Sequence, residues 1–582
     1  MTPDVPCRAD LHCHSTASQL SKLGVQRALG LPECATPPEE VYELAKRRGM
    51  DFVTITDHDT IAGALTIADR PDVFISEELT AWFSHEPQAV HVLCLGITPD
   101  DHGRLQELQL DVESVAAYLH EREIACALAH PFYAVAAPLT ARHRRQLAEL
   151  FPVWEVRNGS RARELNAPAA IYVETHGRTG VGGSDDHAGV DIGRTFTETP
   201  AAATPAEFLA HVRAGRATAR GDQGSAAKWA HAAMALAARS LGRGEGGEPD
   251  PSAVLRMAQR VMSEGDSRAG AIGADLSPDD ARALLRAWLR AVDLDHLDER
   301  GLIDLLQSGG LSHADLFRRA RRAHERRLTA AVGDVVQRLD LGAAAAGVFD
   351  ACVAAIPYAP AAAFLGKEKA KLVARESEPP RVALVADGVG GMHGVTHTLA
   401  ELRERGVPGF DVEVIGTDAN VDRRLPAVAE VDIPFYAGLR VGVPSLPAVV
   451  EALAEGRYDA VHLCAPGPAA IAAGLIAKAM GLPVVASYHT ELAAYARLRT
   501  GDAALEPVVQ ALLAGFYGAA DRVLSPSAAS DARVAALGVP AERVARWDRG
   551  VDLGRFSPGL RREGALPGEV TVLYAGRLTR EK

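Results

Sequence analysis

The sequence predicts an α/β protein of several domains, in which a helical region separates two α/β parts. Short apolar runs alternate with helix-like stretches at both ends of the chain, a pattern typical of βα units built around parallel strands. The middle of the chain is instead rich in Ala, Arg and Leu with helical periodicity, and it offers no strand candidates. A length of 582 residues is enough for about three to five domains.

The first α/β part covers residues 1–223, and the helical region covers residues 224–380. In the first part, strands are predicted at 51–56, 90–97, 125–129 and 153–157, and helices at 38–48 and 105–121. In the helical region, the clearest periodic stretches are 281–292 and 316–339.

The second α/β part covers residues 381–565. Its predicted strands are 382–385, 412–415, 460–464, 484–487 and 523–524, with a helix at 395–405. Because helical stretches separate these strands, we expect a doubly wound, Rossmann-like domain. A last strand at 570–575 begins a new unit within residues 566–582, so we expect the chain to be truncated or split from a longer protein.

Composition and charge restrict the class of protein. The formal net charge is −13, which disfavours a protein whose main task is to bind nucleic-acid phosphates. The seven cysteines are scattered and form no CxxC pair, which excludes a zinc ribbon and a disulfide framework. Neither a signal peptide at the start nor an apolar run of about 18 residues is found. We therefore expect a cytoplasmic enzyme.

A group of histidines and carboxylates marks the first α/β part as a metal-binding region. His12 and His14 in DLHCHS are two residues apart, so both project to the same side of a strand. His58 lies in TITDHDT, where an apolar strand ends, and the carboxyl ends of parallel strands are where ligands gather. Further residues of this kind at strand ends are Glu78, His91, His130, Asp185 and His187.

Imidazole and carboxylate ligands without thiolates suit Mn, Fe or Zn. A carboxylate shared between ions would hold two metals about 3.5–4 Å apart, an arrangement that activates water for attack on phosphorus.

The motifs DLHCHS, TITDHDT, SEELT, AHP and GGSDDH resemble those of the PHP (polymerase and histidinol phosphatase) family over residues 8–222. The resemblance implies a distorted seven-stranded (β/α) barrel with a di- or trinuclear metal centre. It implies that His12, His14, Glu78 and Asp185 hold a first metal. Glu78 would bridge to a second metal held by His91 and His130, and His58 and His187 would belong to a third.

The sequence departs from this family at one ligand of the third metal. Gln19 stands where the family usually has Asp or His, so we expect two metals and a weak third site. Glu77 is the alternative to Glu78 as the bridging carboxylate. Asp57 and Asp59 are candidates to orient the imidazoles, although Asp59 is equally typical of a solvated strand end.

Other polar residues of this part have simpler interpretations. Arg157, Asn158 and Arg161 in EVRNGSR follow a strand and are candidates to bind a substrate phosphate, the alternative being a polar turn. Surface positions are predicted for His85, His102, His120, His143 and His176.

The second α/β part opens with a glycine-rich turn. A strand runs into DGVGGMHGV, which places Gly390 and Gly391 between a strand and a helix, where backbone amides can approach a phosphate or a sugar. The pattern matches neither a dinucleotide-binding fingerprint nor a P-loop. Together with ASYHTELAAY, SPS, WDRGVDLGRFSP and YAGRLTREK, it resembles the retaining family 4 glycosyltransferases of GT-B fold over residues 381–582.

This second resemblance implies a nucleotide-sugar donor and an unknown acceptor. It implies that the loop of Gly390 and Gly391 faces the donor, that His489 is catalytic beside the reacting sugar, and that Arg577 and Lys582 neutralise the departing diphosphate. A buried, structurally satisfied histidine is the alternative for His489. The family's second Rossmann-like domain would lie beyond Lys582, so the transferase half is expected to be incomplete.

The sequence therefore predicts a bifunctional protein that hydrolyses a small phosphorylated substrate and carries a glycosyltransferase region. Two alternatives stay open: a glycosyltransferase with a non-catalytic PHP scaffold, and a nuclease acting on short oligonucleotides.

Overall fold

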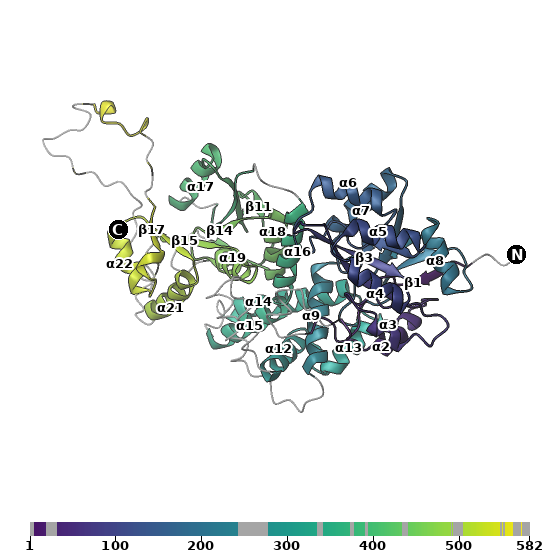
Figure 1. Ribbon diagram of the computed structural model, residues 1–582. Helices are drawn as coiled ribbons and strands as arrows, with labels where there is room; N and C mark the ends of the chain where they lie inside the picture. The colour runs from purple at the N-terminus through teal and green to yellow at the C-terminus, as the bar shows by residue number, and fades with distance from the viewer. Residues whose placement is uncertain are drawn as a thin grey trace. The chain divides into compact units, whose positions relative to one another are not determined.

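The computed structural model describes residues 5–18, 32–241, 278–334, 341–372, 378–389, 394–432, 440–489, 505–547 and 553–562, with residues 492, 550 and 572 (Figure 1). The chain divides into two compact units. Unit 1 comprises residues 1–334 and 340–378, and unit 2 comprises residues 335–339 and 379–582. Each unit is described by itself.

The main sheet of unit 1 has five strands in the order β2-β3-β4-β5-β6. They are β2 (Ser76–Trp82), β3 (Ala89–Leu95), β4 (Ala125–Leu128), β5 (Val153–Asn158) and β6 (Thr179–Gly183). The pairs β4–β5 and β5–β6 are parallel, as predicted, but β2–β3 and β3–β4 are antiparallel. The expectation of parallel strands throughout was wrong here, because residues 83–88 connect β2 and β3 too briefly to hold a crossover helix.

A second sheet of unit 1 has three antiparallel strands, β1 (Cys7–Ala9), β7 (Thr195–Thr199) and β8 (Thr218–Gly221). The predicted strand at 51–56 forms only an isolated bridge between Val53 and Val73. Further isolated bridges, Cys13 with Asp186 and His58 with Glu78, join the segments that carry the predicted metal ligands. The described residues of this part form two sheets, and isolated bridges connect the segments between their strands.

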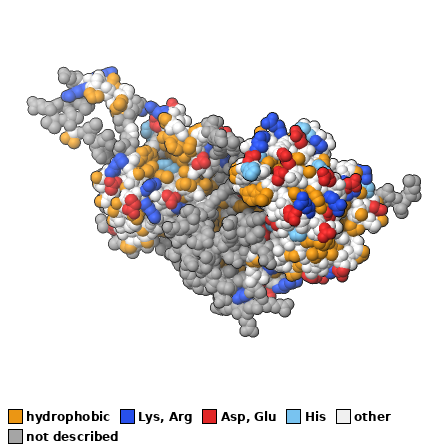
Figure 2. All heavy atoms as spheres, in the orientation of Figure 1, with side chains coloured by type: hydrophobic (Ala, Val, Ile, Leu, Met, Phe, Trp, Pro, Cys, Tyr) orange, Lys and Arg blue, Asp and Glu red, His pale blue; other side chains and the backbone are white. Residues whose placement is uncertain are grey.

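In the described part of residues 1–223, the helices beside these sheets are α2 (Pro38–Arg47), α3 (Ala62–Thr66), α4 (Pro99–Leu108), α5 (Val112–Glu121), α6 (Ala141–Leu150), α7 (Arg163–Thr175) and α8 (Pro205–Arg213). The predicted helix at 105–121 is two helices, α4 and α5. Asp111 caps the second, because its carboxylate accepts a hydrogen bond from the backbone N–H of Ser114. On the face shown in Figure 2, acidic and basic side chains are interspersed over the helices around α5.

The predicted helical region is confirmed for the residues described. It contains α9 (Ala226–Leu241), α12 (Pro278–Ala291), α13 (Glu299–Ser308), α14 (His313–Gly333), α15 (Leu341–Ala355) and α16 (Tyr358–Leu372). Its buried core includes Trp288 and Leu302 and continues into Ala188 and Val190 of the loop that follows β6. The helices thus pack directly on the segment that carries Asp185 and His187.

Unit 2 contains a seven-stranded sheet in the order β11-β10-β9-β14-β15-β16-β17, and every pair in it is parallel. The strands are β9 (Arg381–Val385), β10 (Asp411–Gly416), β11 (Arg423–Arg424), β14 (Ala460–Leu463), β15 (Val484–Ser487), β16 (Arg522–Ser525) and β17 (Val544–Arg546). The order reverses between β9 and β14, which is the switch point where doubly wound sheets bind ligands. The predicted doubly wound arrangement is therefore present.

The other elements of unit 2 connect these strands. An antiparallel hairpin pairs β12 (Ala427–Asp432) with β13 (Arg440–Pro444). The helices are α17 (Gly394–Arg405), α18 (Leu446–Gly456), α19 (Pro468–Ala479), α21 (Leu505–Gly518) and α22 (Ala528–Ala536), with short 3-10 turns at Ala541–Arg543 and Pro558–Leu560.

Within the part of the chain that the structure describes, no single helix has the length and apolarity needed to cross a membrane. One bent pair, Ala346–Ala355 with Tyr358–Gly366, meets those criteria by length and composition only.

Candidate metal centre and glycosyltransferase-like region

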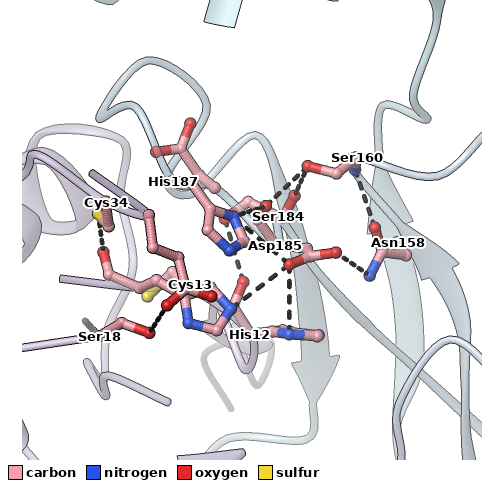
Figure 3. Close-up of polar contacts among 12 residues, drawn as sticks. His12, Cys13, Ser18, Cys34, Asn158, Ser160, Ser184, Asp185 and His187 are labelled. Carbon is pink, nitrogen blue, oxygen red and sulfur yellow. Dashed lines mark hydrogen bonds and ion pairs between the residues drawn. The ribbon is translucent and has the colours of Figure 1, made fainter. Parts of the chain in front are cut away.

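The two histidines of DLHCHS lie in a buried segment directly after β1. The loop after β6 runs beside them, because the Asp185 N–H donates to the His12 carbonyl (2.6 Å) and the His14 N–H donates to the Asp186 carbonyl (3.1 Å). Gly183 at the end of β6 permits this approach, since a Cβ there would lie 2.3 Å from the Cβ of His12. Figure 3 shows Asp185 pointing toward His12 as a result.

Glu78 on β2 is fully buried and lies at the centre of the site. Its Oε1 is 2.6 Å from His91 Nδ1 and 3.0 Å from His130 Nε2. These two histidines come from β3 and from the end of β4. One oxygen of the carboxylate therefore faces the ligand set predicted for the second metal.

The other oxygen of Glu78 faces a different group of imidazoles. Oε2 is 3.2 Å from His12 Nε2, 3.4 Å from His14 Nε2 and 3.0 Å from His58 Nδ1. A carboxylate with imidazole nitrogens around both oxygens has the arrangement of a ligand that bridges two cations.

Asp185 completes the first group. Its Oδ1 is 3.4 Å from the Nε2 atoms of both His12 and His14. Its Oδ2 accepts a hydrogen bond from Asn158 Nδ2 (3.1 Å) and lies 3.2 Å from Arg161 Nη2. His187 stacks on His14 with ring centroids 4.2 Å apart.

All eight predicted ligands thus fall into groups whose nitrogen or oxygen atoms lie within 4.8 Å of one another. The groups are His12, Glu78 and His130; His12, His14 and Asp185; His58, Glu78 and His91; and His14, His58 and His187. Several converging atoms are buried and make no hydrogen bond: His12 Nε2, His14 Nδ1 and Nε2, Glu78 Oε2 and His130 Nδ1. Buried polar atoms in this state require a partner, and cations held between them would supply one, so the residues fit a metal centre.

The charges of Glu78 and His14 fit the same interpretation. His12 differs, because burial lowers its pKa but the carboxylates of Glu78, Glu155 and Asp185 raise it well above the usual value. Burial opposes ionisation of Glu78, but the neighbouring His91, His58 and His12 hold its pKa well below the usual value. Burial, with the nearby His187, lowers the pKa of His14 to about 3. At neutral pH His14 is therefore an uncharged imidazole, the form that ligates a metal.

Glu155 on β5 is a residue that sequence reasoning missed. Its Oε1 lies 3.0 Å from His12 Nδ1, and its Oε2 accepts hydrogen bonds from the His130 N–H (2.8 Å) and from Asn158 Nδ2 (2.9 Å). Glu155 therefore orients residues of both sides of the site. The signal was present in the sequence, because Glu155 is an acidic residue between the apolar Trp154 and Val156 of a predicted strand.

Three carboxylates that the sequence offered as a bridging ligand or as partners of the imidazoles make other contacts. Glu77 faces away from the site and contacts His102 Nδ1 (2.8 Å) and Gln106 Nε2 (2.9 Å), so Glu78 is the carboxylate inside the cluster. The contacts found for Asp57 and Asp59 are not to imidazoles but to local backbone and hydroxyls: Asp57 accepts from the N–H and hydroxyl of Ser15, and Asp59 from those of Thr80.

The residues of EVRNGSR make contacts within the protein. Arg157 donates to the Gly221 carbonyl (2.8 Å), and Asn158 donates to Asp185 and Glu155, so their predicted contact with a substrate phosphate stays a prediction. Arg161 is buried beside Asp185, with its guanidinium 3.9 Å from the centre of the Tyr133 ring. Its Nε and Nη1 are buried and make no hydrogen bond.

The surface prediction was wrong for His143 and incomplete for His102. His143 is buried, because it closes the N-terminus of α6 with Thr140 and contacts Glu86 (2.8 Å). His102 is partly covered by its contact with Glu77. His85, His120 and His176 are exposed, as expected.

In unit 2, a buried carboxylate lies at the switch point of the sheet. Asp387 follows β9 and accepts hydrogen bonds from the backbone N–H groups of Ala469 (2.9 Å) and Ala470 (3.1 Å) at the start of α19. Burial raises the pKa of Asp387 to about 7. A Cβ at Gly467 would lie 2.4 Å from the Asp387 carboxyl carbon, so glycine is needed for this contact.

His489 lies just after β15 and is half-buried. Its ring centroid is 4.8 Å from that of Trp547, and Trp547 also contacts His462 at 5.6 Å. Gly390, Gly391, Arg577 and Lys582 lie outside the described residues, as do Gln19 and most of residues 566–582.

Two family models match different parts of the chain. The model of glycosyltransferase family 4 matches residues 389–555, and a PHP-associated model matches residues 163–217. A GDP-mannose-dependent alpha-mannosyltransferase of Mycobacterium tuberculosis is 32% identical over 222 residues, which are 35% of this chain and 57% of that protein. Sulfoquinovosyl transferase SQD2 of Arabidopsis thaliana is 29% identical over 157 residues, 26% of this chain and 31% of that protein.

The chain spans 57% of the mycobacterial relative's length. Among solved structures, an amidohydrolase from Chromobacterium violaceum is similar with a TM-score of 0.27 and 17% identity, covering 36% of this chain and 97% of that one. A putative metal-dependent phosphoesterase from Bifidobacterium adolescentis gives a TM-score of 0.21 and 15% identity, covering 31% of this chain and 87% of that one. From the two matching family models, the chain contains a PHP-associated region followed by a region of glycosyltransferase family 4.

Proposed function

We propose that unit 1 is a metal-dependent phosphoesterase. The observation that carries this proposal is Glu78, a buried carboxylate whose two oxygens face two different groups of imidazoles. Divalent Mn, Fe or Zn bound there would supply a water nucleophile at neutral pH and stabilise charge on the phosphoryl oxygens.

The protein side chains have separate tasks in this proposal. We assign His12, His14 and Asp185 to the first position. His91 and His130, which both face Glu78 Oε1, are assigned to the second, and Glu78 is shared between the two. His58 and His187 belong to the third. Glu155 fixes the orientation of His12, which is what outer carboxylates do for metal-bound histidines.

Arg161 is the residue we assign to the substrate phosphate. Nη2 is held by Asp185, while Nε and Nη1 are buried next to the metal cluster without a hydrogen bond. A guanidinium with two such donors matches the oxygens of a phosphoryl group.

Hydrolysis of p-nitrophenyl phosphate and of a short oligonucleotide by the Mn-loaded protein tests this proposal. Asp185→Ala should abolish hydrolysis, whereas His120→Ala, at an exposed position on α5, should leave it unchanged. Cleavage of the oligonucleotide alone would favour the nuclease alternative. Metal binding without hydrolysis of either substrate would favour a non-catalytic scaffold.

We further propose that the family 4 region uses a nucleotide-sugar donor. The family match and the relatives named for GDP-mannose support this and make GDP-mannose the first donor to test. Calorimetry with GDP-mannose and UDP-glucose should detect binding that His489→Ala weakens and His397→Ala, at an exposed position on α17, does not. Equal affinity in both variants would remove His489 from the donor site.

A further inference from the structure

One group in the metal cluster differs from the others in its chemistry. Three of the four groups formed by the described residues contain a carboxylate, either Glu78 or Asp185. The group of His14, His58 and His187 contains imidazoles only. It is the third position, for which the sequence offered Gln19 in place of an acidic residue.

The structure places a different carboxylate beside this group. Glu33 is 3% exposed, and its Oε1 lies 3.1 Å from His58 Nε2. This distance is similar to those between Glu78 and its imidazoles (2.6–3.4 Å). The distance from Glu33 to His58 is therefore within the range of the distances between predicted ligands at the other positions.

Ser18 holds Glu33 and His58 together. Its hydroxyl donates to Glu33 Oε2 (3.1 Å) and accepts from the His58 backbone N–H (3.3 Å). Ser18 follows DLHCHS closely, so the segment with the first two histidines also fixes the carboxylate at the third position. Glu33 is thus a positioned side chain and not a surface residue that happens to approach.

We propose that Glu33 supplies the carboxylate ligand for a third divalent cation, together with His58 and His187. This inference rests on the metal centre of the proposed function. The side chain of His187 is 21% exposed and that of His58 is 8% exposed, whereas the side chains of His12 and Glu78 are fully buried. The third cation would therefore lie on the solvent-facing side of the cluster, where a phosphoester must enter.

The test counts metals in the full chain. The protein is loaded with Mn and dialysed against buffer. The number of Mn ions per chain is then measured by inductively coupled plasma mass spectrometry. We expect three Mn in the parent, two in Glu33→Gln, and a third ion in Glu33→Asp that binds more weakly than in the parent. Glu39→Gln, at an exposed position in the first turn of α2, is the matched control and should retain three.

Titration of the third ion gives a readout that does not depend on hydrolysis. Glu33→Gln should weaken its binding by at least about 10-fold, and leave the two tighter ions unchanged. Gln19→Asp should have little effect, because the carboxylate is already present. Three tight ions in Glu33→Gln, or two ions in both parent and variant, would overturn the inference.

Two further outcomes separate this inference from the proposed function. A folded Glu33→Gln that binds no metal, beside a parent with three, would show that Glu33 acts on the whole cluster and would overturn its assignment to the third position. A parent that binds no metal would overturn the metal centre itself. Circular dichroism of each variant confirms that it is folded.

Discussion

At the scale of single residues, the predicted metal ligands are held in place by neighbouring side chains that are not themselves predicted ligands. Glu155 is the clearest, because one carboxylate contacts His12 and also holds the backbone of His130 and the amide of Asn158. A single residue thus aligns ligands from both positions.

Glu155→Gln should weaken metal binding by about 10–100-fold without removing it. The amide carries no charge, and its NH₂ group cannot accept the hydrogen bonds that both carboxylate oxygens now receive. Mn titration against a chelator measures this change. Glu149→Gln on the exposed side of α6 is the control, and equal affinity in the two variants would contradict the role given to Glu155.

Asp387 makes the stability of unit 2 depend on pH. Its pKa is raised from 3.8 to about 7 by burial, so the folded protein retains a proton that the unfolded chain loses above pH 4. The free energy of unfolding should therefore fall by up to about 4 kcal/mol as pH rises from about 4 to 7. Above pH 7 it should change little. Thermal unfolding of the parent and of Asp387→Asn at pH 5 and pH 8 measures it.

Unfolding is followed by tryptophan fluorescence, to which Trp547 of unit 2 and the four tryptophans of unit 1 contribute. Each thermal scan of the parent is therefore compared with a scan of Asp387→Asn at the same pH. The expected result is a larger loss of stability in the parent than in Asp387→Asn between the two pH values. The same pH dependence in both proteins would show that Asp387 is ionised throughout.

At the scale of elements, the loop after β6 is shaped by Asp186. Its carboxylate accepts hydrogen bonds from successive backbone N–H groups, among them Ala188 (3.0 Å), Val190 (3.1 Å) and Asp191 (2.7 Å). This arrangement fixes the loop between Asp185 and His187 on one side and the helical core on the other. The predicted metal ligands of this loop are therefore preorganised by backbone contacts.

Gly183→Ala should damage this arrangement directly. The added Cβ would lie 2.3 Å from the Cβ and 2.6 Å from the backbone N of His12, and neither atom belongs to a flexible side-chain end. We expect a loss of about 1–3 kcal/mol in unfolding free energy and weaker metal binding.

Gly103→Ala is the control for this substitution. No heavy atom lies within 4 Å of a Cβ at that position in α4, and alanine favours a helix over glycine. Chemical denaturation of both variants measures the difference. A Gly183→Ala variant as stable as the control would contradict the close approach of β6 to His12.

At the scale of the whole molecule, the helical region of unit 1 is part of the support for the metal-binding loop. A buried chain of contacts runs from Tyr358 through His231 (2.9 Å) and His313 (3.0 Å) to Asp191 (3.0 Å). All four residues are buried. The helices therefore reach, through polar contacts as well as apolar packing, the loop that carries Asp185.

His313→Leu should destabilise unit 1 by about 2–4 kcal/mol, because it removes a partner from both His231 and Asp191 inside the protein. His296→Leu, at an exposed position, should change stability by less than about 0.5 kcal/mol. Denaturant unfolding followed by circular dichroism compares the two. Equal stability would show that the buried chain of contacts contributes nothing.

The sequence predicted the doubly wound sheet of unit 2, and it identified the histidines and carboxylates that the structure brings together in unit 1. Apolar runs and helical periodicity identify strands and helices, and histidines at strand ends stand out against such runs. Strand direction was not encoded in the same way, so the antiparallel pairing of β3 with β2 and β4 was not predicted. Glu33 was missed because it follows a stretch without periodicity, and Glu155 because its partners come from distant segments.

The most direct test of the metal centre is a paired measurement of bound metal and phosphoester hydrolysis in the parent and in His130→Ala. His130 is buried and faces Glu78 Oε1, the oxygen that we assign to the second position. We predict that the parent binds at least two divalent transition metals and hydrolyses p-nitrophenyl phosphate. We predict that His130→Ala retains a metal at the first position and loses hydrolysis. A parent that contains no metal and is not activated by Mn, or a variant with unchanged metal content and rate, would contradict this account of the site.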